Sequence, residues 1–289
     1  AIPNYLDEDG LAAYFPGGRG SDTLTAYVLA VTNEAGFPIP DNARERMEGG
    51  LIAFVEGRVQ RQFWSPVKDL DQRKIAAIEA LSRTGKAKPK LFESITLQPN
   101  LWPTHTVIDW LAILQRVQGI PKRDEHLAQA EQVLRARLSM QGTKLVFSTE
   151  RDDYWWWLMV GGDINAAKLI AVTVDRPGWR EDMPRLVSGL VARQVKGAWQ
   201  TTTANLWGGL ALDKTWVVVA DPIPAGATIL GAGLERDSIV AQAGERKTGD
   251  AWPAYEERSF EAFRSYYEYA PKGKWTTEYT VRLNQDGEF

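Results

Sequence analysis

The sequence contains no cysteine among its 289 residues. This absence excludes disulfide bonds, thiolate metal sites and a cysteine nucleophile within these residues, but it does not fix the cellular compartment. Histidine is also scarce, and no zinc-ligand spacing, glycine-rich phosphate loop or Gly-x-Ser-x-Gly motif is present. No apolar run approaches the roughly 18 to 20 residues that a membrane helix needs. We therefore expect neither a cofactor nor a metal.

Neither sign of charge dominates the chain. Its 34 lysines and arginines nearly balance 37 aspartates and glutamates, and these residues are dispersed, which argues against a nucleic-acid partner. The hydrophobic fraction of 44% is ordinary for a globular protein, and the length allows two domains as readily as one. The first residues lack the regions of a signal peptide and read like the middle of a domain, so we expect a fragment.

One motif recurs over most of the chain: an aromatic residue in a short turn, a capping residue, and an apolar helix. After Trp199, for example, Thr201 offers a hydroxyl to the first turn of a helix whose apolar face includes Leu206 and Leu210. The aromatic residues that begin these units lie about 45 residues apart. They are Phe15, Trp64, Trp102, Phe147 and Trp199.

A repeat of this length with two helices indicates stacked helical hairpins. Either an open solenoid or a closed α/α toroid can be built from them. The short aromatic turns and the apolar inner helices favour the toroid. Since only part of such a ring is present, we expect the first hairpin to precede Ala1.

The character of the sequence changes at Lys214. Residues 216–220 are mostly β-branched and precede a turn rich in proline and glycine, which predicts a strand. Residues 259–269 and 274–283 are expected to form a hairpin around residues 270–273, because large side chains alternate along its second strand. This part of the chain therefore indicates an antiparallel β-sandwich that is only partly present.

The fold class that we expect is thus α+β and multidomain. An α/α toroid covers residues 1–214, and a partial β-sandwich covers residues 215–289. Almost no linker separates Leu212 from Thr215. We therefore expect that residues are missing from the sequence at this point.

Several residues invite a functional interpretation, each beside a structural one. The acidic clusters at 7–9 and 150–153 are better explained as a polar loop and as helix caps than as metal or cyclase motifs. His105 stands just inside a helix start, where it would face the hub of a toroid, although a lone histidine is more often structural. The aromatic residues 154–157 can stack sugars, but on a helix most of them would belong to the core or an interface. His126 is expected at the surface.

Several stretches resemble the alpha-2-macroglobulin family. Residues 20–29 (GSDTLTAYVL), 141–150 (QGTKLVFSTE) and 199–208 (WQTTTANLWG) look like helix starts of its thioester-containing domain. Residues 221–231 (DPIPAGATILG) and 258–267 (RSFEAFRSYY) are similar to the C-terminal macroglobulin-like domain of its bacterial members. The resemblance covers essentially the whole chain in order.

This resemblance implies a protease inhibitor and not an enzyme. In the family, cleavage of a bait region by an attacking protease exposes an internal thioester within a Cys-x-Glu-Gln motif, and a nucleophile of the protease is then acylated. The implied partners are attacking proteases and other domains of the same large polypeptide. Bacterial members are generally periplasmic and anchored at the inner membrane through a distant N-terminal lipid, so we expect the same location here.

The chain departs from the family in having no cysteine and no Cys-x-Glu-Gln motif. Either the motif lies before Ala1, or the protein is a paralogue without a thioester. The family also places a β-rich segment where Leu212 meets Thr215, which agrees with missing residues there. Some members relay the acyl group through a histidine, but the residues around His105 do not match that motif, so we do not assign it this role.

Two other functions stay open. One is an enzyme built on a toroid, a glycosidase or a cyclase, which would need a carboxylate pair facing an aromatic-lined hub with a cleft of ligand size. The other is a non-covalent scaffold, which fits a paralogue without a thioester.

Overall fold

The computed structural model describes residues 2–149, 154–220, 228–231 and 279–282. The chain divides into a helical unit, Ala1–Val218, and a second unit, Val219–Phe289. Helices predominate, and the described strands form two short antiparallel pairs, so the expected α+β class is confirmed. Within the described ranges, no helix is long and apolar enough to cross a membrane.

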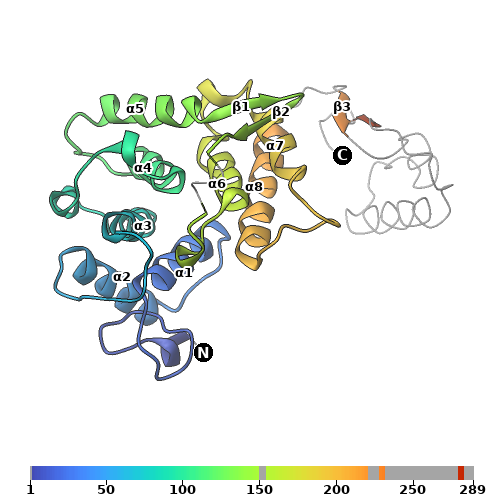
Figure 1. Ribbon diagram of the computed structural model, residues 1–289. Helices are drawn as coiled ribbons and strands as arrows, with labels where there is room; N and C mark the ends of the chain where they lie inside the picture. The colour runs from blue at the N-terminus through green and yellow to red at the C-terminus, as the bar shows by residue number, and fades with distance from the viewer. Residues whose placement is uncertain (1, 150–153, 221–227, 232–278, 283–289) are drawn as a thin grey trace, which may run out of the picture. The chain divides into compact units, whose positions relative to one another are not determined.

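The helical unit consists of α-helices joined by short turns of 3-10 helix (Figure 1). The α-helices are α1 (Asp22–Glu34), α2 (Asp41–Val55), α3 (Leu70–Ser82), α4 (Thr104–Arg116), α5 (Arg123–Ala136), α6 (Gly162–Thr173), α7 (Met183–Val191) and α8 (Thr202–Ala220). The 3-10 turns are η1 (Ile2–Tyr5), η2 (Pro89–Ser94), η3 (Pro99–Leu101), η4 (Trp156–Leu158) and η5 (Pro177–Trp179).

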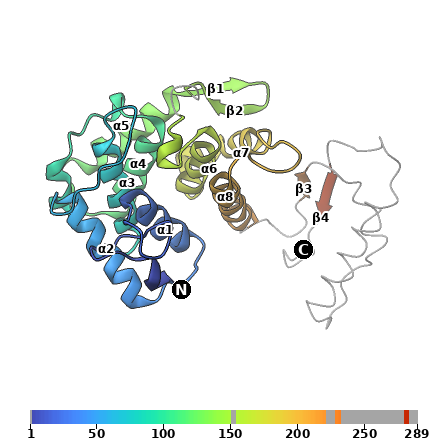
Figure 2. The same cartoon turned by 60° about the horizontal axis from the view of Figure 1, so that its bottom comes forward.

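The helices of this unit fall into an inner and an outer set. The inner helices α1, α3, α4 and α6 pack each against the next, while α2 packs on α1 and α3, α5 on α4, and α7 on α6 (Figures 1 and 2). Trp207 places α8 in the inner set, because its side chain reaches the same interior as residues of the other four. Helix α4 is buried almost all round, whereas the buried residues of α5 are Ala130 and Leu134. Trp110 and Trp179 are among the largest fully buried side chains. This alternation is the one expected of stacked hairpins, and the closed toroid stays a prediction.

Capping residues begin two of the inner helices as expected. The hydroxyl of Ser21 accepts a hydrogen bond from the N–H of Leu24 at 3.2 Å, and the hydroxyl of Thr201 accepts one from the N–H of Ala204 at 3.1 Å. Each bond satisfies an N–H of a first helical turn that has no partner within the helix. Helix α2 has no such cap, although Asp41 at its start was expected to provide one. Asp41 is the first residue of the helix, Pro40 precedes it, and no side chain among the described residues caps the helix.

The prediction of a strand at residues 216–220 is wrong, because helix α8 continues to Ala220. No glycine or proline interrupts the chain between Leu210 and Ala220. Extending an existing helix avoids the cost of nucleating new structure, and this outweighs the modest β preference of the three valines. Leu212 and Thr215 therefore lie within one uninterrupted helix.

A β-hairpin takes the place expected for the end of one helix and the start of the next. Strand β1 (Leu138–Gln141) pairs with β2 (Lys144–Phe147) in antiparallel register, with Leu138 opposite Phe147. Gly142 in the turn has a φ of 61°. Glycine adopts this left-handed backbone conformation readily because it has no Cβ. Of the aromatic residues that follow, Trp156 and Trp157 belong to the single 3-10 turn η4, while Tyr154 and Trp155 precede it. The first inner helix after this hairpin is therefore α6.

The second unit contains the pair β3 (Thr228–Gly231) and β4 (Tyr279–Arg282), in which Ile229 lies opposite Val281. Strand β4 falls within the strand expected at residues 274–283. Its expected partner at 259–269 and the turn at 270–273 lie outside the described residues.

A glycine pair tests the packing of the first loop. Gly10 has a φ of 81°, and a Cβ there would lie 2.3 Å from the carbonyl oxygen of Arg46, whereas Gly57 has a φ of 77° and open space around it. Gly57→Ala should lower the free energy of unfolding by about 1 kcal/mol through backbone strain alone. Gly10→Ala should cost about 3 kcal/mol, because the overlap with α2 is added. Urea unfolding measures both. Equal losses would contradict the close packing of Gly10 on α2.

Candidate functional site

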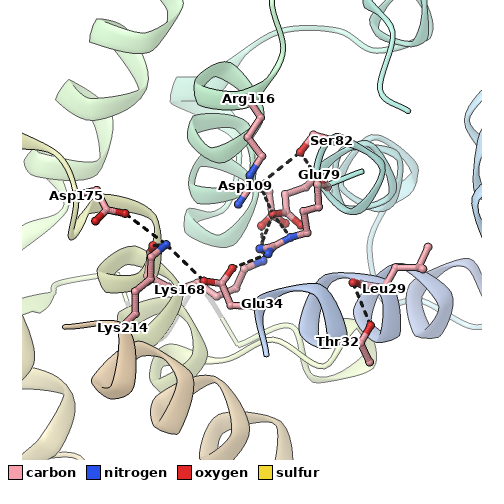
Figure 3. A network of polar contacts seen from close by, with 12 residues as sticks. Leu29, Thr32, Glu34, Glu79, Ser82, Asp109, Arg116, Lys168, Asp175 and Lys214 are labelled. Atoms are coloured by element: carbon pink, nitrogen blue, oxygen red, sulfur yellow. Dashed lines mark hydrogen bonds and ion pairs between the residues drawn. The ribbon is translucent and has the colours of Figure 1, made fainter. Parts of the chain in front are cut away.

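Charged side chains from all five inner helices gather between these helices (Figure 3). We call them the hub network. Its members are Glu34 of α1, Glu79 of α3, Arg83 at the end of α3, Asp109 and Arg116 of α4, Lys168 of α6 and Lys214 of α8. Charges in a protein interior must be paired, so the arrangement of these groups is tightly constrained.

Arg83 joins two helices through carboxylates. Its guanidinium lies 2.5 Å from Glu34 Oε2 and 2.8 Å from Glu79 Oε1, and its side chain is only 2% exposed. The guanidinium carbon also lies 5.7 Å from the ring centre of Trp207, a cation–π distance. The residue thus links α1, α3 and α8.

Glu79 is the anionic centre of the network. Its Oε1 accepts hydrogen bonds from both Arg83 and Arg116 at 2.8 Å. Burial alone would raise the pKa of this carboxyl, but the charges of Arg83, Lys168 and Arg116 outweigh burial and lower the pKa from 4.5 to about 2. Glu79 is therefore an ionised structural anion at neutral pH.

Asp109 pairs with Lys168, whose ammonium donates a hydrogen bond to Asp109 Oδ1. Burial raises the pKa of Asp109, and the negative charge of Glu79 raises it further, against the opposite effect of Lys168. The two buried carboxyls of the hub are therefore shifted in opposite directions.

Lys214 joins the last inner helix to the first. Its ammonium lies 3.5 Å from Glu34 Oε1 and 3.6 Å from Asp175 Oδ2, and it donates a hydrogen bond of 2.8 Å to the carbonyl of Ala171 (Figure 3). These contacts hold α8 against both α1 and the end of α6.

A cavity of about 60 Å³ lies beside the network, and His105 lines it together with Asp109, Lys168 and Trp207. His105 is 3% exposed, and neither ring nitrogen has a hydrogen-bond partner among the described residues. Its ring meets the edge of Trp155 at 5.3 Å. Burial, followed by the positive charges of Lys168 and Arg137, lowers the pKa of His105 from 6.5 to about 3. His105 thus lies in the hub as a neutral imidazole, and a functional role for it stays a prediction.

The carboxyls of Glu79 and Asp109 have pKa values shifted in opposite directions, as in the acid–base pairs of enzymes. The space beside them is much too small for that use. Ligand pockets usually measure about 300–1,000 Å³, whereas this cavity of about 60 Å³ has room for little more than water. The arrangement therefore balances charge inside the fold and offers no room for a sugar or an isoprenoid substrate.

The other candidates from the sequence lie elsewhere. Asp7 organises the first loop, since its carboxylate accepts the N–H groups of Leu11 and Gly20 and pairs with Arg61 at 2.6 Å. Burial opposes these contacts, but together they lower the pKa of Asp7. No cluster able to hold a metal ion occurs in the described part of the chain, and residues 150–153 lie outside it. His126 is half-buried and meets the edge of Trp110 at 5.9 Å.

The aromatic run at 154–157 divides between inside and outside. Trp155 packs on His105, and the indole N–H of Trp157 donates to Asp69 Oδ2 at 3.0 Å. Tyr154 and Trp156 are exposed. Trp155 and Trp157 therefore pack against the helical unit, whereas Tyr154 and Trp156 remain at its surface.

None of the members of the hub network, acidic or basic, was identified from the sequence. Glu79 and Arg83 are separated by one helical turn, a spacing that also fits an ordinary surface pair. A charged residue within a mostly apolar helix, such as Lys168 in α6, does indicate a buried ion pair. It does not indicate which residue far away in the sequence carries the opposite charge.

Removal of Arg83 tests the network. Arg83→Met would leave Glu34 and Glu79 buried without their common partner, so the free energy of unfolding should fall by about 3–5 kcal/mol. Arg58→Met is the matched control, because Arg58 forms an exposed pair with Glu56 worth about 0–1 kcal/mol. Urea unfolding at pH 7 compares them. Similar losses in both variants would show that Arg83 does not hold the hub together.

The pKa of His105 predicts a dependence of stability on pH. Below pH 6.5 the unfolded state binds a proton at His105 that the folded state refuses down to about pH 3, so this contribution to stability falls as the pH falls. Its loss should be about 1.4 kcal/mol per pH unit in that window. His105→Phe should abolish it, whereas His126→Gln leaves His105 in place and should retain it. Identical pH profiles for the wild type and His105→Phe would contradict the buried neutral state.

Comparisons with known proteins place the chain beside one family. Residues 210–289 match the model described as the bacterial alpha-2-macroglobulin MG10 domain. No curated protein sequence matches the chain significantly.

Solved structures show the same relationship at the level of the fold. Salmonella alpha-2-macroglobulin reacted with methylamine is 16% identical, with a TM-score of 0.55 over 81% of this chain and 14% of that protein. Escherichia coli alpha-2-macroglobulin activated by porcine elastase is 14% identical, with a TM-score of 0.53 over 80% of this chain and 20% of the other. A native E. coli structure from domain MG7 to the C-terminus is 15% identical, with a TM-score of 0.53 over 79% and 34%. The resemblance to bacterial alpha-2-macroglobulins is therefore confirmed, by sequence for residues 210–289 and by fold for about four fifths of the chain.

Proposed function

We propose that this chain is part of a bacterial alpha-2-macroglobulin-like inhibitor that traps attacking proteases. The observation that carries the proposal is the joint match of residues 210–289 to the MG10 model and of the fold to several alpha-2-macroglobulin structures. Two of those relatives are described as activated by porcine elastase and by trypsin, and a third as reacted with methylamine. The chain spans 14–34% of the first matched structures, so trapping belongs to a longer polypeptide.

Within that polypeptide, we assign the helical unit to the thioester-type domain and its inner helices to the hub of an α/α toroid. Two features support this assignment. The inner and outer helices alternate along the chain, and Lys214 of α8 contacts Glu34 of α1, the first α-helix. The hub network would then hold the inner helices as one rigid body. A domain of this kind can be displaced as a whole when a bait region is cut, because packed interiors transmit displacement without deforming.

Trapping would be covalent if a Cys-x-Glu-Gln thioester is present elsewhere in the polypeptide. In that step an amine nitrogen bonds to the former glutamine carbonyl carbon, the carbon–sulfur bond breaks, and the sulfur leaves as a thiolate that takes up a proton. Non-covalent trapping or scaffolding is the form expected without the motif. The small hub cavity supports a role other than catalysis, since a toroidal glycosidase or cyclase needs space for its substrate. A periplasmic location with a distant lipid anchor is part of the same proposal.

The test uses the full-length polypeptide and two measurements. Incubation with elastase should protect casein from cleavage while a small chromogenic peptide is still hydrolysed, because a trapped protease is enclosed but intact. Treatment with methylamine, followed by titration of thiols, should release one thiol for each amine incorporated if a thioester is present.

The two results separate the parts of the proposal. Casein cleavage that is unaffected by a molar excess of the polypeptide would overturn protease trapping. Protection of casein without any released thiol would keep trapping and remove the covalent step. Bovine serum albumin at the same concentration is the control for protection by simple competition.

A further inference from the structure

A second and larger cavity opens at the start of α6 and α8, and it shares Met159, Val160 and Ile164 with the hub cavity. It measures about 370 Å³, which is within the usual range for small-molecule sites. Residues just before and within the first turn of α6 line one side, and Gln200, Thr201 and Thr203 at the start of α8 line the other. Helices α6 and α8 lie side by side in both views of the fold (Figures 1 and 2). We call this cavity the α6–α8 cleft.

One wall of the cleft is aromatic and remains exposed to solvent. Trp156 and Tyr154 line it, with 56% and 63% of their surfaces exposed. Trp156 is nevertheless held in place: its ring stacks on that of Trp64 at 6.1 Å and meets the edge of Trp157 at 6.0 Å. Trp157 is in turn anchored by its hydrogen bond to Asp69. An aromatic face that is fixed in orientation but left uncovered is preorganised to receive a flat apolar partner surface.

The opposite wall is polar, and among the described lining residues its charged side chains are one acid and one base. These two, Asp163 and Arg193, form an ion pair at 2.5 Å. The hydroxyls of Thr201 and Thr203 lie 3.1 Å apart at the rim, beside the exposed Gln200. The wall thus offers several hydrogen-bonding groups to a neutral ligand.

These two walls select among ligand classes. A ligand of either charge would meet one like and one opposite charge of the Asp163–Arg193 pair and would gain little there. A wholly apolar ligand would remove polar groups from water without replacing their hydrogen bonds. A sugar ring satisfies both walls, because its C–H face stacks on an aromatic ring while its hydroxyl groups hydrogen-bond at the edge. We propose that the α6–α8 cleft is a binding site for a neutral oligosaccharide, with Trp156 and Tyr154 as the stacking residues. The proposal goes beyond protease trapping and does not depend on it.

The experiment measures saccharide binding by this chain with isothermal titration calorimetry and tryptophan fluorescence. The probes are chitotetraose, cellotetraose and maltotetraose, which differ in linkage and in the N-acetyl group. At least one should bind with a dissociation constant in the micromolar to millimolar range. Trp156→Ala and Tyr154→Ala should each weaken that binding at least tenfold. Phe37→Ala is the matched control, because Phe37 is 66% exposed on the link between α1 and α2 and does not line the cleft.

Each result bears on the proposal. Circular dichroism and thermal unfolding establish that the variants keep the wild-type fold, since both substituted side chains are largely exposed. Binding that Trp156→Ala and Phe37→Ala reduce equally would overturn the site. Absence of binding for all three tetrasaccharides at 10 mM would overturn the ligand class, as would binding of an aromatic peptide alone.

Discussion

The interior of the helical unit depends on the buried charge of Arg83. A guanidinium that is almost wholly removed from water is tolerated only when anions lie close to it, and here they come from Glu34 of α1 and Glu79 of α3. Trp207 of α8 covers the same group. One side chain at the end of α3 therefore contacts residues of three inner helices. Burial would raise the pKa of Glu79, but Arg83, together with Lys168 and Arg116, lowers it.

The hub is consequently rich in ionisable groups but poor in space. Its two buried carboxyls have pKa values shifted in opposite directions, a pattern known from acid–base catalysis, yet the adjoining cavity of about 60 Å³ has no room for a substrate. The charges determine how the inner helices pack. This fits the proposed role of a domain that moves as one body within a larger inhibitor, where rigidity matters more than chemistry at the hub.

The aromatic residues that begin the repeated units have two different surroundings. Trp199 is buried, its indole N–H donates to the carbonyl of Leu190 at 3.0 Å, and its ring lies against Gly208, where an added Cβ would come within 2.6 Å. Trp64 occupies the equivalent turn before α3 but is exposed and stacks on Trp156. The two residues differ because other segments cover Trp199 but leave Trp64 exposed to solvent. Trp199 therefore completes the core, whereas Trp64 supports the exposed ring of Trp156.

The sequence by itself determined the features that depend on neighbouring residues. Helical periodicity and the caps at Ser21 and Thr201 act within one turn of the chain, so the helix starts at these two residues were predicted. Prediction was wrong where local preferences compete, as in residues 216–220, where continuation of α8 outweighs the β preference of valine. His105 was expected to face the hub, and it lines the hub cavity. Only the tertiary structure decided that Arg83 bridges Glu34 and Glu79 and that Trp64 supports Trp156. These contacts join residues far apart in the chain, and no local pattern encodes which distant side chain will complete a buried pair.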